Sequence, residues 1–365
     1  MNVERLHRVL KELKEDIEDS NLVTYGSQVQ THLQNQVNQP NQPTHQTKLV
    51  ESLRQMYSAL EDSNYNQLTP STKQIIAEIT NDLPLGNDLK SQIEEIFATN
   101  SITPANALEE IKVLNSEMNE RVSAIESTLE GFEGLNIPDE DLDPGESELG
   151  YSIPRKYVDN KLVSLKDEIA ELNFILNIIS ESVTGEKQDY KVRTISSSDF
   201  LLYIIIGLQV ADVISKGIER ILNHYEQILR IKSLRNQLKA EGIPDSKTKS
   251  IGTHANGLMS SRIKKIAKEV IEEHYEGETG RKNELENALT ISFNKLANRI
   301  DKGFHVEIRV KQLDQPEEDE EINAEEQETM DLITSIQESS KNIEYIESNG
   351  ESILELPEGK KKASS

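Results

Sequence analysis

An unbroken run of apolar residues in steps of four and three is the feature that most constrains how this chain can fold. The run covers residues 158–183. Its members are Val158, Leu162, Leu165, Ile169, Leu172, Leu176, Ile179 and Val183. Apolar residues at this heptad spacing form the seam along which one helix winds against another. The stretch therefore predicts a long helix that buries one narrow face.

An upstream segment repeats the same spacing. Its seam consists of Ile111, Asn115, Met118, Val122, Ile125, Leu129 and Phe132. Asparagine at a seam position lowers stability and usually fixes the register of the paired helices. The connector between the two seams is long enough for the chain to double back, so we expect an antiparallel coiled-coil hairpin. In the alternative arrangement, the seams pair between chains or present a binding surface.

The rest of the chain predicts a mainly α protein, an elongated helical bundle with a small C-terminal β element. Ten of the nineteen residues at 28–46 are Gln or Asn, a composition typical of flexible linkers. Phe304, Val306, Ile308 and Val310 alternate with polar residues, as in a strand. Asn349-Gly350 is a two-residue hairpin signal.

These patterns divide the chain into six expected parts. They are an N-terminal helix (1–25), a Gln/Asn-rich linker (26–47), a small helical bundle (48–100), a coiled-coil body of long helices (101–242), a basic loop with two helices and a strand (243–313), and an acidic segment with a hairpin and a loose tail (314–365).

Composition narrows the function classes. The formal net charge is -25, from 65 acidic and 40 basic residues, which argues against a protein that coats nucleic acid over its whole surface. The chain has no cysteine, so disulfides, thiolate metal sites and a cysteine nucleophile are excluded. The first residues, MNVERLHRVLKELKED, lack the apolar core of a signal peptide, and we expect a cytoplasmic protein.

Residues 200–211 form an uncharged, mostly apolar run between Asp199 and Asp212. We expect this run to begin a long helix that continues to about Glu241. At about 1.5 Å per residue it would be roughly 18 Å long, against a membrane core of about 30 Å. We therefore expect a buried core helix or a partner-docking patch, with a membrane-inserting segment as the alternative.

A basic region at 247–268 is the most site-like feature of this acidic chain. Its candidate binding residues are Lys247, Lys249, His254, Arg262, Lys264, Lys265 and Lys268. A flexible loop at 252–257 is expected to lead into a helix that begins at Ser260 or Ser261, whose free N–H groups would attract an anion. The region predicts a site for phosphate, nucleic acid or an acidic partner. Alternatively, it is an exposed loop that meets the chain's own acidic segment at 317–328.

Asp139, Asp141 and Asp143 resemble the start of a calcium-binding loop, in which alternate carboxylates converge on one cation. Pro144 stands where that motif requires glycine, and Gly150 where it requires a bidentate glutamate. We therefore expect a solvated acidic loop and no metal.

The sequence selects no catalytic residue and no cofactor. Its leading prediction is a non-enzymatic coiled-coil scaffold or adaptor that binds other proteins or copies of itself. One alternative is a regulatory protein that binds nucleic acid or a phosphate ligand through 247–268. A second is a membrane-acting effector that uses 200–211. Nucleic-acid binding and membrane contact are not favoured.

Overall fold

The computed structural model describes residues 3–196, 200–242, 244–313, 323–345 and 352–359. These residues contain twelve α-helices and one four-stranded antiparallel sheet, so the prediction of a mainly α protein is confirmed. The chain divides into two compact units, Met1–Asp141 and Leu142–Ser365. Each unit has its own buried apolar core.

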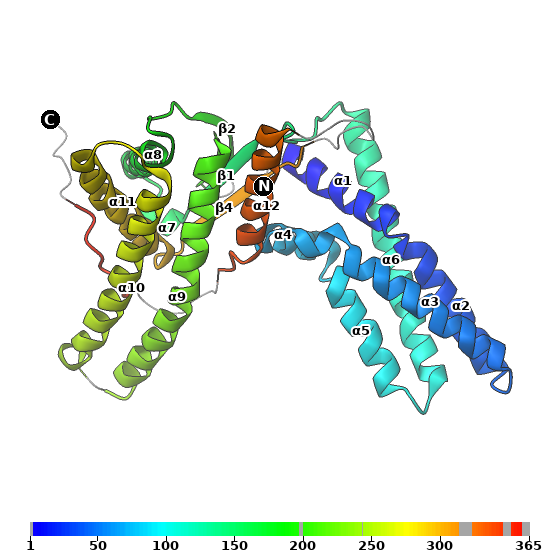
Figure 1. Ribbon diagram of the computed structural model, residues 1–365. Coiled ribbons are helices and arrows are strands. Elements are labelled where there is room, and N and C mark those ends of the chain that lie inside the picture. The colour runs from blue at the N-terminus through cyan, green and yellow to red at the C-terminus, as the bar shows by residue number, and fades with distance from the viewer. Residues whose placement is uncertain (1–2, 197–199, 243, 314–322, 346–351, 360–365) are drawn as a thin grey trace. The chain divides into compact units, whose positions relative to one another are not determined.

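Unit 1 is entirely helical where it is described (Figure 1). Its helices are α1 (Val3–Asp19), α2 (Leu22–Asn38), α3 (Pro43–Asp62), the 3-10 turn η1 (Asn64–Gln67), α4 (Pro70–Thr80), α5 (Gly86–Thr99) and α6 (Pro104–Gly134). Helix α2 packs between α3 and α6, and α1 and α5 also contact α6. The apolar face of α6 is therefore buried within this unit.

The Gln/Asn-rich linker expected at 26–47 is not found, because α2 and α3 occupy this stretch and pack against each other. Val29 and Leu33 are almost completely buried and lie one turn apart on α2. Most of the Gln and Asn side chains are on the other faces of the two helices. Composition alone predicted a linker because it does not register that a few apolar residues share one helix face.

Unit 2 combines a sheet with six helices. Its elements are β1 (Ser147–Ile153), α7 (Arg155–Val158), α8 (Leu162–Thr184), β2 (Lys191–Ser196), β3 (Phe200–Ile206), α9 (Leu208–Ala240), α10 (Asp245–His274), α11 (Thr279–Ile300), β4 (His305–Val310) and α12 (Ala324–Lys341). The strand order is β2-β3-β1-β4, and Tyr151 lies opposite both Leu202 and Val306. The strand predicted near 304–310 is confirmed, but the sheet draws its other strands from the middle of the chain.

The apolar run at 200–211 begins as a strand, so the predicted helix there is wrong over 200–206. This segment is β3, which lies between β2 and β1 in the sheet. Leu202, Tyr203 and Ile204 are consecutive and all buried, which means that side chains on both faces of the strand are covered. A short, continuous run rich in isoleucine suits such a strand. Helix α9 starts only at Leu208.

The coiled-coil hairpin is also wrong, because its two predicted arms belong to different units. Helix α6 packs on α1, α2 and α5 of unit 1, whereas α8 packs on α9, α10 and α11 of unit 2. The second seam is not continuous either. Asp159 and Asn160 have left-handed backbone angles that separate Val158, at the end of α7, from α8. The sequence pattern correctly predicted helices but assigned them the wrong partners.

Residues 353–358 follow α12 in the chain and are held by the end of α11. The Asp301 carboxylate accepts hydrogen bonds from the backbone N–H groups of Ile353 and Leu354, at 2.6 and 2.7 Å. The Asn298 amide both accepts from the N–H of Leu356 and donates to its carbonyl. The predicted hairpin turn at Asn349-Gly350, the residues 314–322 of the acidic segment and the tail at 360–365 lie outside the described residues.

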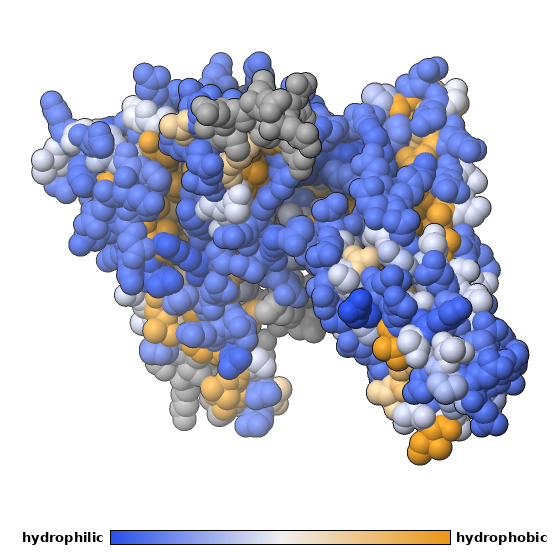
Figure 2. Space-filling view, turned by 45° about the vertical axis from the view of Figure 1, so that its right-hand side comes forward, coloured by the Kyte–Doolittle hydropathy of each residue, from blue (hydrophilic) through white to orange (hydrophobic). Residues whose placement is uncertain are grey.

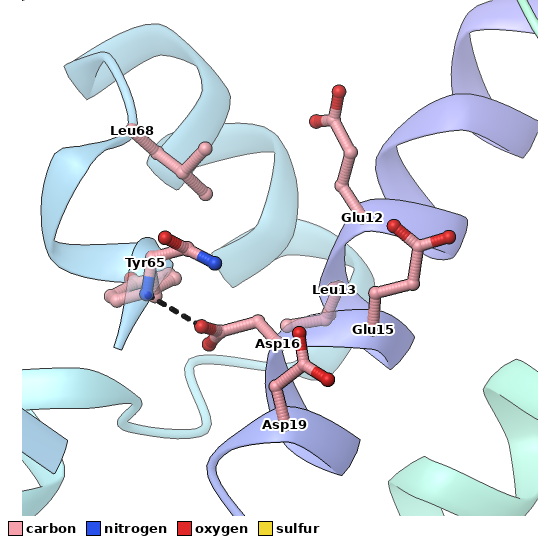
Figure 3. Close-up of a pocket in the computed structure, with 8 residues that line it drawn as sticks. Glu12, Leu13, Glu15, Asp16, Asp19, Tyr65 and Leu68 are labelled. Carbon is pink, nitrogen blue, oxygen red and sulfur yellow. Dashed lines mark hydrogen bonds between the residues drawn. The ribbon is translucent and has the colours of Figure 1, made fainter. Parts of the chain in front are cut away.

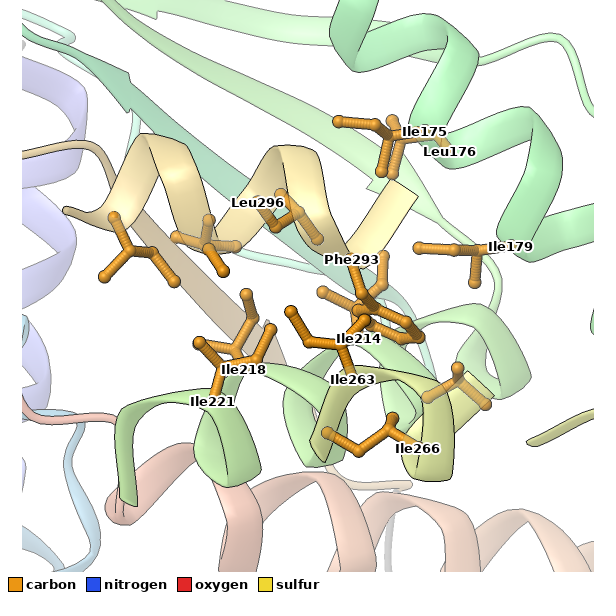
Figure 4. Close-up of a cluster of buried hydrophobic side chains, with 14 of the residues drawn as sticks. Ile175, Leu176, Ile179, Ile214, Ile218, Ile221, Ile263, Ile266, Phe293 and Leu296 are labelled. Atoms are coloured by element: carbon orange, nitrogen blue, oxygen red, sulfur yellow. The ribbon is translucent and has the colours of Figure 1, made fainter. Parts of the chain in front are cut away.

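Four helices meet in the core of unit 2 (Figure 4). Ile175 and Ile179 of α8, Ile214 and Ile218 of α9, Ile263 and Ile266 of α10, and Phe293 and Leu296 of α11 point into one cluster. Helices α9 and α11 approach closely at Gly217 of α9. A Cβ atom on this residue would lie 2.5 Å from Cε1 of Phe293, so the absence of a side chain allows the ring to pack there.

We expect Gly217→Ala to lower the free energy of unfolding by about 1–3 kcal/mol, because the fully buried Phe293 ring has little room to move. Gly257→Ala is the matched control, since a Cβ atom on this α10 residue meets no atom within 4 Å. That change should stabilise the protein by roughly 0.5–1 kcal/mol. Urea denaturation measures both effects. Equal stabilities for the two variants would show that the contact at Gly217 is not restrictive.

Candidate functional site

The basic region at 247–268 is helical throughout, so the predicted loop and its anion site at a helix start are wrong. Helix α10 begins at Asp245, which places the backbone N–H groups of Ser260 and Ser261 in the middle of the helix. The helix continues through Gly252 and Gly257 because one of its faces is apolar. That face consists of the buried residues Ala255, Met259, Ile263 and Ile266.

A pocket of about 310 Å³ lies between α9 and α10, and two of the predicted residues line it. We call it the α9/α10 pocket. Helix α9 contributes His224, Gln227 and Ile228, and α10 contributes Leu258, Met259, Ser261, Arg262 and Lys265. Ile228 and Met259 are buried, whereas Gln227, Ser261 and Lys265 are exposed. The pocket thus joins an apolar surface to a set of polar groups.

The charge of the α9/α10 pocket is positive. None of its eight lining residues is acidic, in a chain whose net charge is -25. The Nε atom of Arg262 is buried and has no hydrogen-bond partner in the part of the chain that the structure describes. Burial lowers the pKa of His224, and the positive charge of Arg262 lowers it further. Both effects favour the uncharged imidazole beside a permanent cation.

The other predicted basic residues lie outside the pocket. Lys264 and His254 are exposed. Lys268 pairs with Glu272 at 3.6 Å. Glu269 is shared by Lys265 at 3.6 Å and Arg220 at 2.7 Å. Lys247 and Lys249 lie in the first turns of α10, and their side chains are outside the described set. The seven candidates therefore do not form one site.

The seam asparagine of α6 acts within unit 1. Asn115 donates hydrogen bonds to the carbonyl oxygen of Gly26 at 2.9 Å and to Oε1 of Gln30 at 2.8 Å, both on α2. A Cβ atom on Gly26 would lie 2.6 Å from Oδ1 of Asn115, so the glycine allows this contact. Of its seam neighbours, Met118 and Ile125 are buried and Val122 is partly buried. Asn115 therefore fixes where α2 crosses α6.

We expect Asn115→Leu to destabilise unit 1 by about 1–3 kcal/mol, because the Gly26 carbonyl loses its partner and the larger side chain is forced against α2. Asn119→Leu is the control, since Asn119 is exposed one turn away on α6. Thermal unfolding followed by circular dichroism compares the variants. The assignment fails if both changes have the same effect.

The seam of α8 is buried only in its second half. Leu172, Leu176, Ile179 and Val183 lie in the core, and Leu165 is partly buried. Leu162 and Ile169 are exposed instead, because a heptad seam drifts around a straight helix by about 20° in each repeat. Val163 and Phe174 are exposed beside them. We call Leu162, Val163, Ile169 and Phe174 the α8 stripe.

Sequence reasoning missed a buried ion pair between α8 and α11. The guanidinium of Arg299, on α11, donates to both carboxylate oxygens of Glu168, at 2.8 and 3.2 Å. Lys295 pairs with Glu171 close by. Glu168 lies three residues after Leu165 and four before Leu172, on the face that those leucines define. A charged residue at such a position was the signal that could have revealed the pair.

We expect Arg299→Met to destabilise the protein by about 3–5 kcal/mol, because the buried Glu168 carboxylate is left without its partner. The double variant Arg299→Met with Glu168→Met should recover much of this loss. Arg281→Met removes an exposed pairing with Glu181 and should change stability little. Urea denaturation distinguishes the three. A double variant no more stable than Arg299→Met alone contradicts the interpretation.

A second pocket, of about 260 Å³, lies in unit 1 and is acidic (Figure 3). Glu12, Glu15, Asp16 and Asp19 of α1 line it together with residues around η1. The Asp16 carboxylate accepts hydrogen bonds from the Ser63 hydroxyl at 2.8 Å and from the backbone N–H of Asn64 at 2.6 Å. Asp16 therefore anchors the turn after α3, and its role is structural.

The aspartates that resemble a calcium loop are not brought together. Asp139 pairs with Lys11 at 2.6 Å, and this hydrogen bond lowers the pKa of the carboxyl group. Over the described ranges, no group of three or more His, Asp or Glu side chains is placed to hold a metal ion. None of the helices that the structure describes is long and apolar enough to cross a membrane.

Comparisons with models of protein families, with curated proteins and with solved structures found no match for this chain. The positions of its own side chains therefore carry the inferences about function.

Proposed function

We propose that this chain is a non-enzymatic helical assembly protein that pairs with a second copy of itself through the α8 stripe. The observation that carries the proposal is the exposure of four large apolar side chains within residues 162–174 of α8. Leu162 is 80% exposed, Val163 67%, Ile169 38% and Phe174 40%. Single exposed apolar residues are common, but a group of them on one helix suggests an interface.

The spacing of the α8 stripe favours a second helix as the occupant. Leu162 and Ile169 are seven residues apart, so they lie two turns apart on the same face. If two copies of α8 run antiparallel about a two-fold axis, Leu162 of one copy lies beside Ile169 of the other. The same contact then occurs twice, as a two-fold interface requires. Val163 and Phe174 lie on a neighbouring face of the helix, where the Lys295 ammonium lies 5.1 Å from the centre of the Phe174 ring.

The charges around the α8 stripe are compatible with this pairing despite the acidic composition of the chain. Lys166 and Asp167 lie 3.4 Å apart, and Lys161 and Asp159 lie 3.1 Å apart. Each pair is neutral overall, so a second copy meets no excess of like charge beside the stripe. Elsewhere the visible surface is mostly hydrophilic and is broken by separate hydrophobic patches (Figure 2).

Sedimentation equilibrium of the full chain tests the proposal. We expect a species of twice the 41.3 kDa chain mass, in equilibrium with the monomer. The double variant Leu162→Ser with Ile169→Ser should be monomeric, with an unchanged far-UV circular-dichroism spectrum, because both residues are on the surface. Val192→Ser with Ile195→Ser is the control, since it removes exposed apolar residues from β2 and should leave the dimer intact.

Two results would overturn the proposal. One is a monomeric wild-type chain at every concentration. The other is a dimer that survives the change in the α8 stripe, or that is lost equally in the β2 control.

A further inference from the structure

We propose that the α9/α10 pocket binds a small organic phosphate, with the phosphate held by the polar side chains and the organic part resting on the apolar residues. This activity is independent of assembly through α8. The inference starts from the shape of the site, which at about 310 Å³ is at the small end of the range for small-molecule pockets.

The polar side chains of the pocket supply more hydrogen-bond donors than a carboxylate needs. Arg262 carries a guanidinium, Lys265 an ammonium, Gln227 an amide, Ser261 a hydroxyl and His224 an imidazole. A phosphate monoester offers three terminal oxygens to such a set, whereas a carboxylate offers two. Hydrogen bonds between a cation and an anionic oxygen are also stronger than neutral ones.

Arg262 is the group that most needs a ligand. Its Nε atom is buried, and none of the described acidic residues forms an ion pair with it. A buried donor that has lost water without gaining a partner lowers stability, so an anion beside the guanidinium compensates for that loss. Lys265 shares Glu269 with Arg220 at the edge of the pocket and is 65% exposed, which leaves it free to turn inward.

The apolar side of the pocket indicates an organic group on the phosphate. Ile228 and Met259 are buried, and Leu258 is partly exposed beside them. Leu258 is 40% exposed, so inorganic phosphate would leave its side chain in contact with water, whereas a ring or short chain would cover it. An organic phosphate should therefore bind more tightly than phosphate alone.

The surroundings of the pocket disfavour a nucleic-acid strand. Around the pocket, Lys268 of α10 pairs with Glu272, and Arg220 of α9 pairs with Glu269. A strand would need a row of free cations along its phosphates. Arg262 and Lys265 instead place two cations together at the pocket.

Isothermal titration calorimetry of the full chain with phenyl phosphate tests the inference. We expect one site per chain, with phenyl phosphate binding more tightly than inorganic phosphate and more tightly than benzoate. Arg262→Gln should weaken binding by roughly tenfold or more, which corresponds to the loss of a charge-assisted hydrogen bond. Lys264→Gln is the matched control, because it makes the same change in charge at an exposed residue of α10 outside the pocket and should bind as the wild type does.

Two further measurements complete the test of the pocket. Circular dichroism establishes that both variants are folded, and Met259→Ala should reduce the advantage of phenyl phosphate over inorganic phosphate. The inference is overturned if phenyl phosphate does not bind, if Arg262→Gln and Lys264→Gln weaken binding equally, or if benzoate binds as tightly as phenyl phosphate. A single-stranded oligonucleotide that binds more tightly than phenyl phosphate, and loses affinity in both variants, would overturn it in favour of diffuse electrostatic attraction.

Discussion

The burial on all sides of the last nine residues of α11 is the constraint on which the rest of unit 2 depends. Every residue from 292 to 300 is buried, although Asn294, Lys295, Asn298 and Arg299 are polar or charged. Such groups destabilise a core unless they find partners there. Helix α8 supplies Glu168 and Glu171, and the segment at 353–358 supplies backbone groups. The positions of these two elements follow from what α11 requires.

The same constraint bears on both proposed binding surfaces. Because α8 is fixed to α11 by Glu168 and by its buried apolar residues, the side chains of the α8 stripe project from a supported helix. The α9/α10 pocket is likewise formed by two helices whose inner faces enter the common core through residues such as Ile218 and Ile263. Binding groups on rigid elements lose little conformational freedom when a partner arrives.

The sequence predicted those parts of the fold whose pattern is local. Alternation at Phe304–Val310 identified β4, and the 3.6-residue period identified most helices. The sequence pattern failed where the structure depends on which element packs against a helix or strand. The heptad spacing of α6 and α8 correctly predicted two helices, but spacing does not say which other helix packs against each. In α8 the buried face also includes Glu168, so it is not the face that the apolar seam predicted. Residues 200–206 became a strand because both faces are covered, which an apolar run alone does not reveal.

The candidate sites, too, could be predicted only where the sequence signal is local. Arg262 and Lys265 stood out as cations in an acidic chain, whereas His224 and Gln227 come from a helix some forty residues earlier and become neighbours only through packing. The glycines at 252 and 257 suggested a loop because glycine destabilises a helix, which can be read from the sequence. The burial of Ala255 and Met259 against neighbouring helices offsets this destabilisation, but it cannot be read from the sequence.

The attachment of residues 353–358 to α11 has a consequence for how the protein forms during synthesis. Unit 1 needs only the first 141 residues, because α6, on which α1 and α2 pack, ends before residue 141, so it can fold while the remainder is being made. Unit 2 cannot fold in this way. Its strand β1, near residue 150, pairs with β4, which lies beyond residue 304, and the Asp301 carboxylate accepts a hydrogen bond from Leu354. The order of synthesis therefore lets the first unit fold while the second still lacks the segments that complete its sheet and its core.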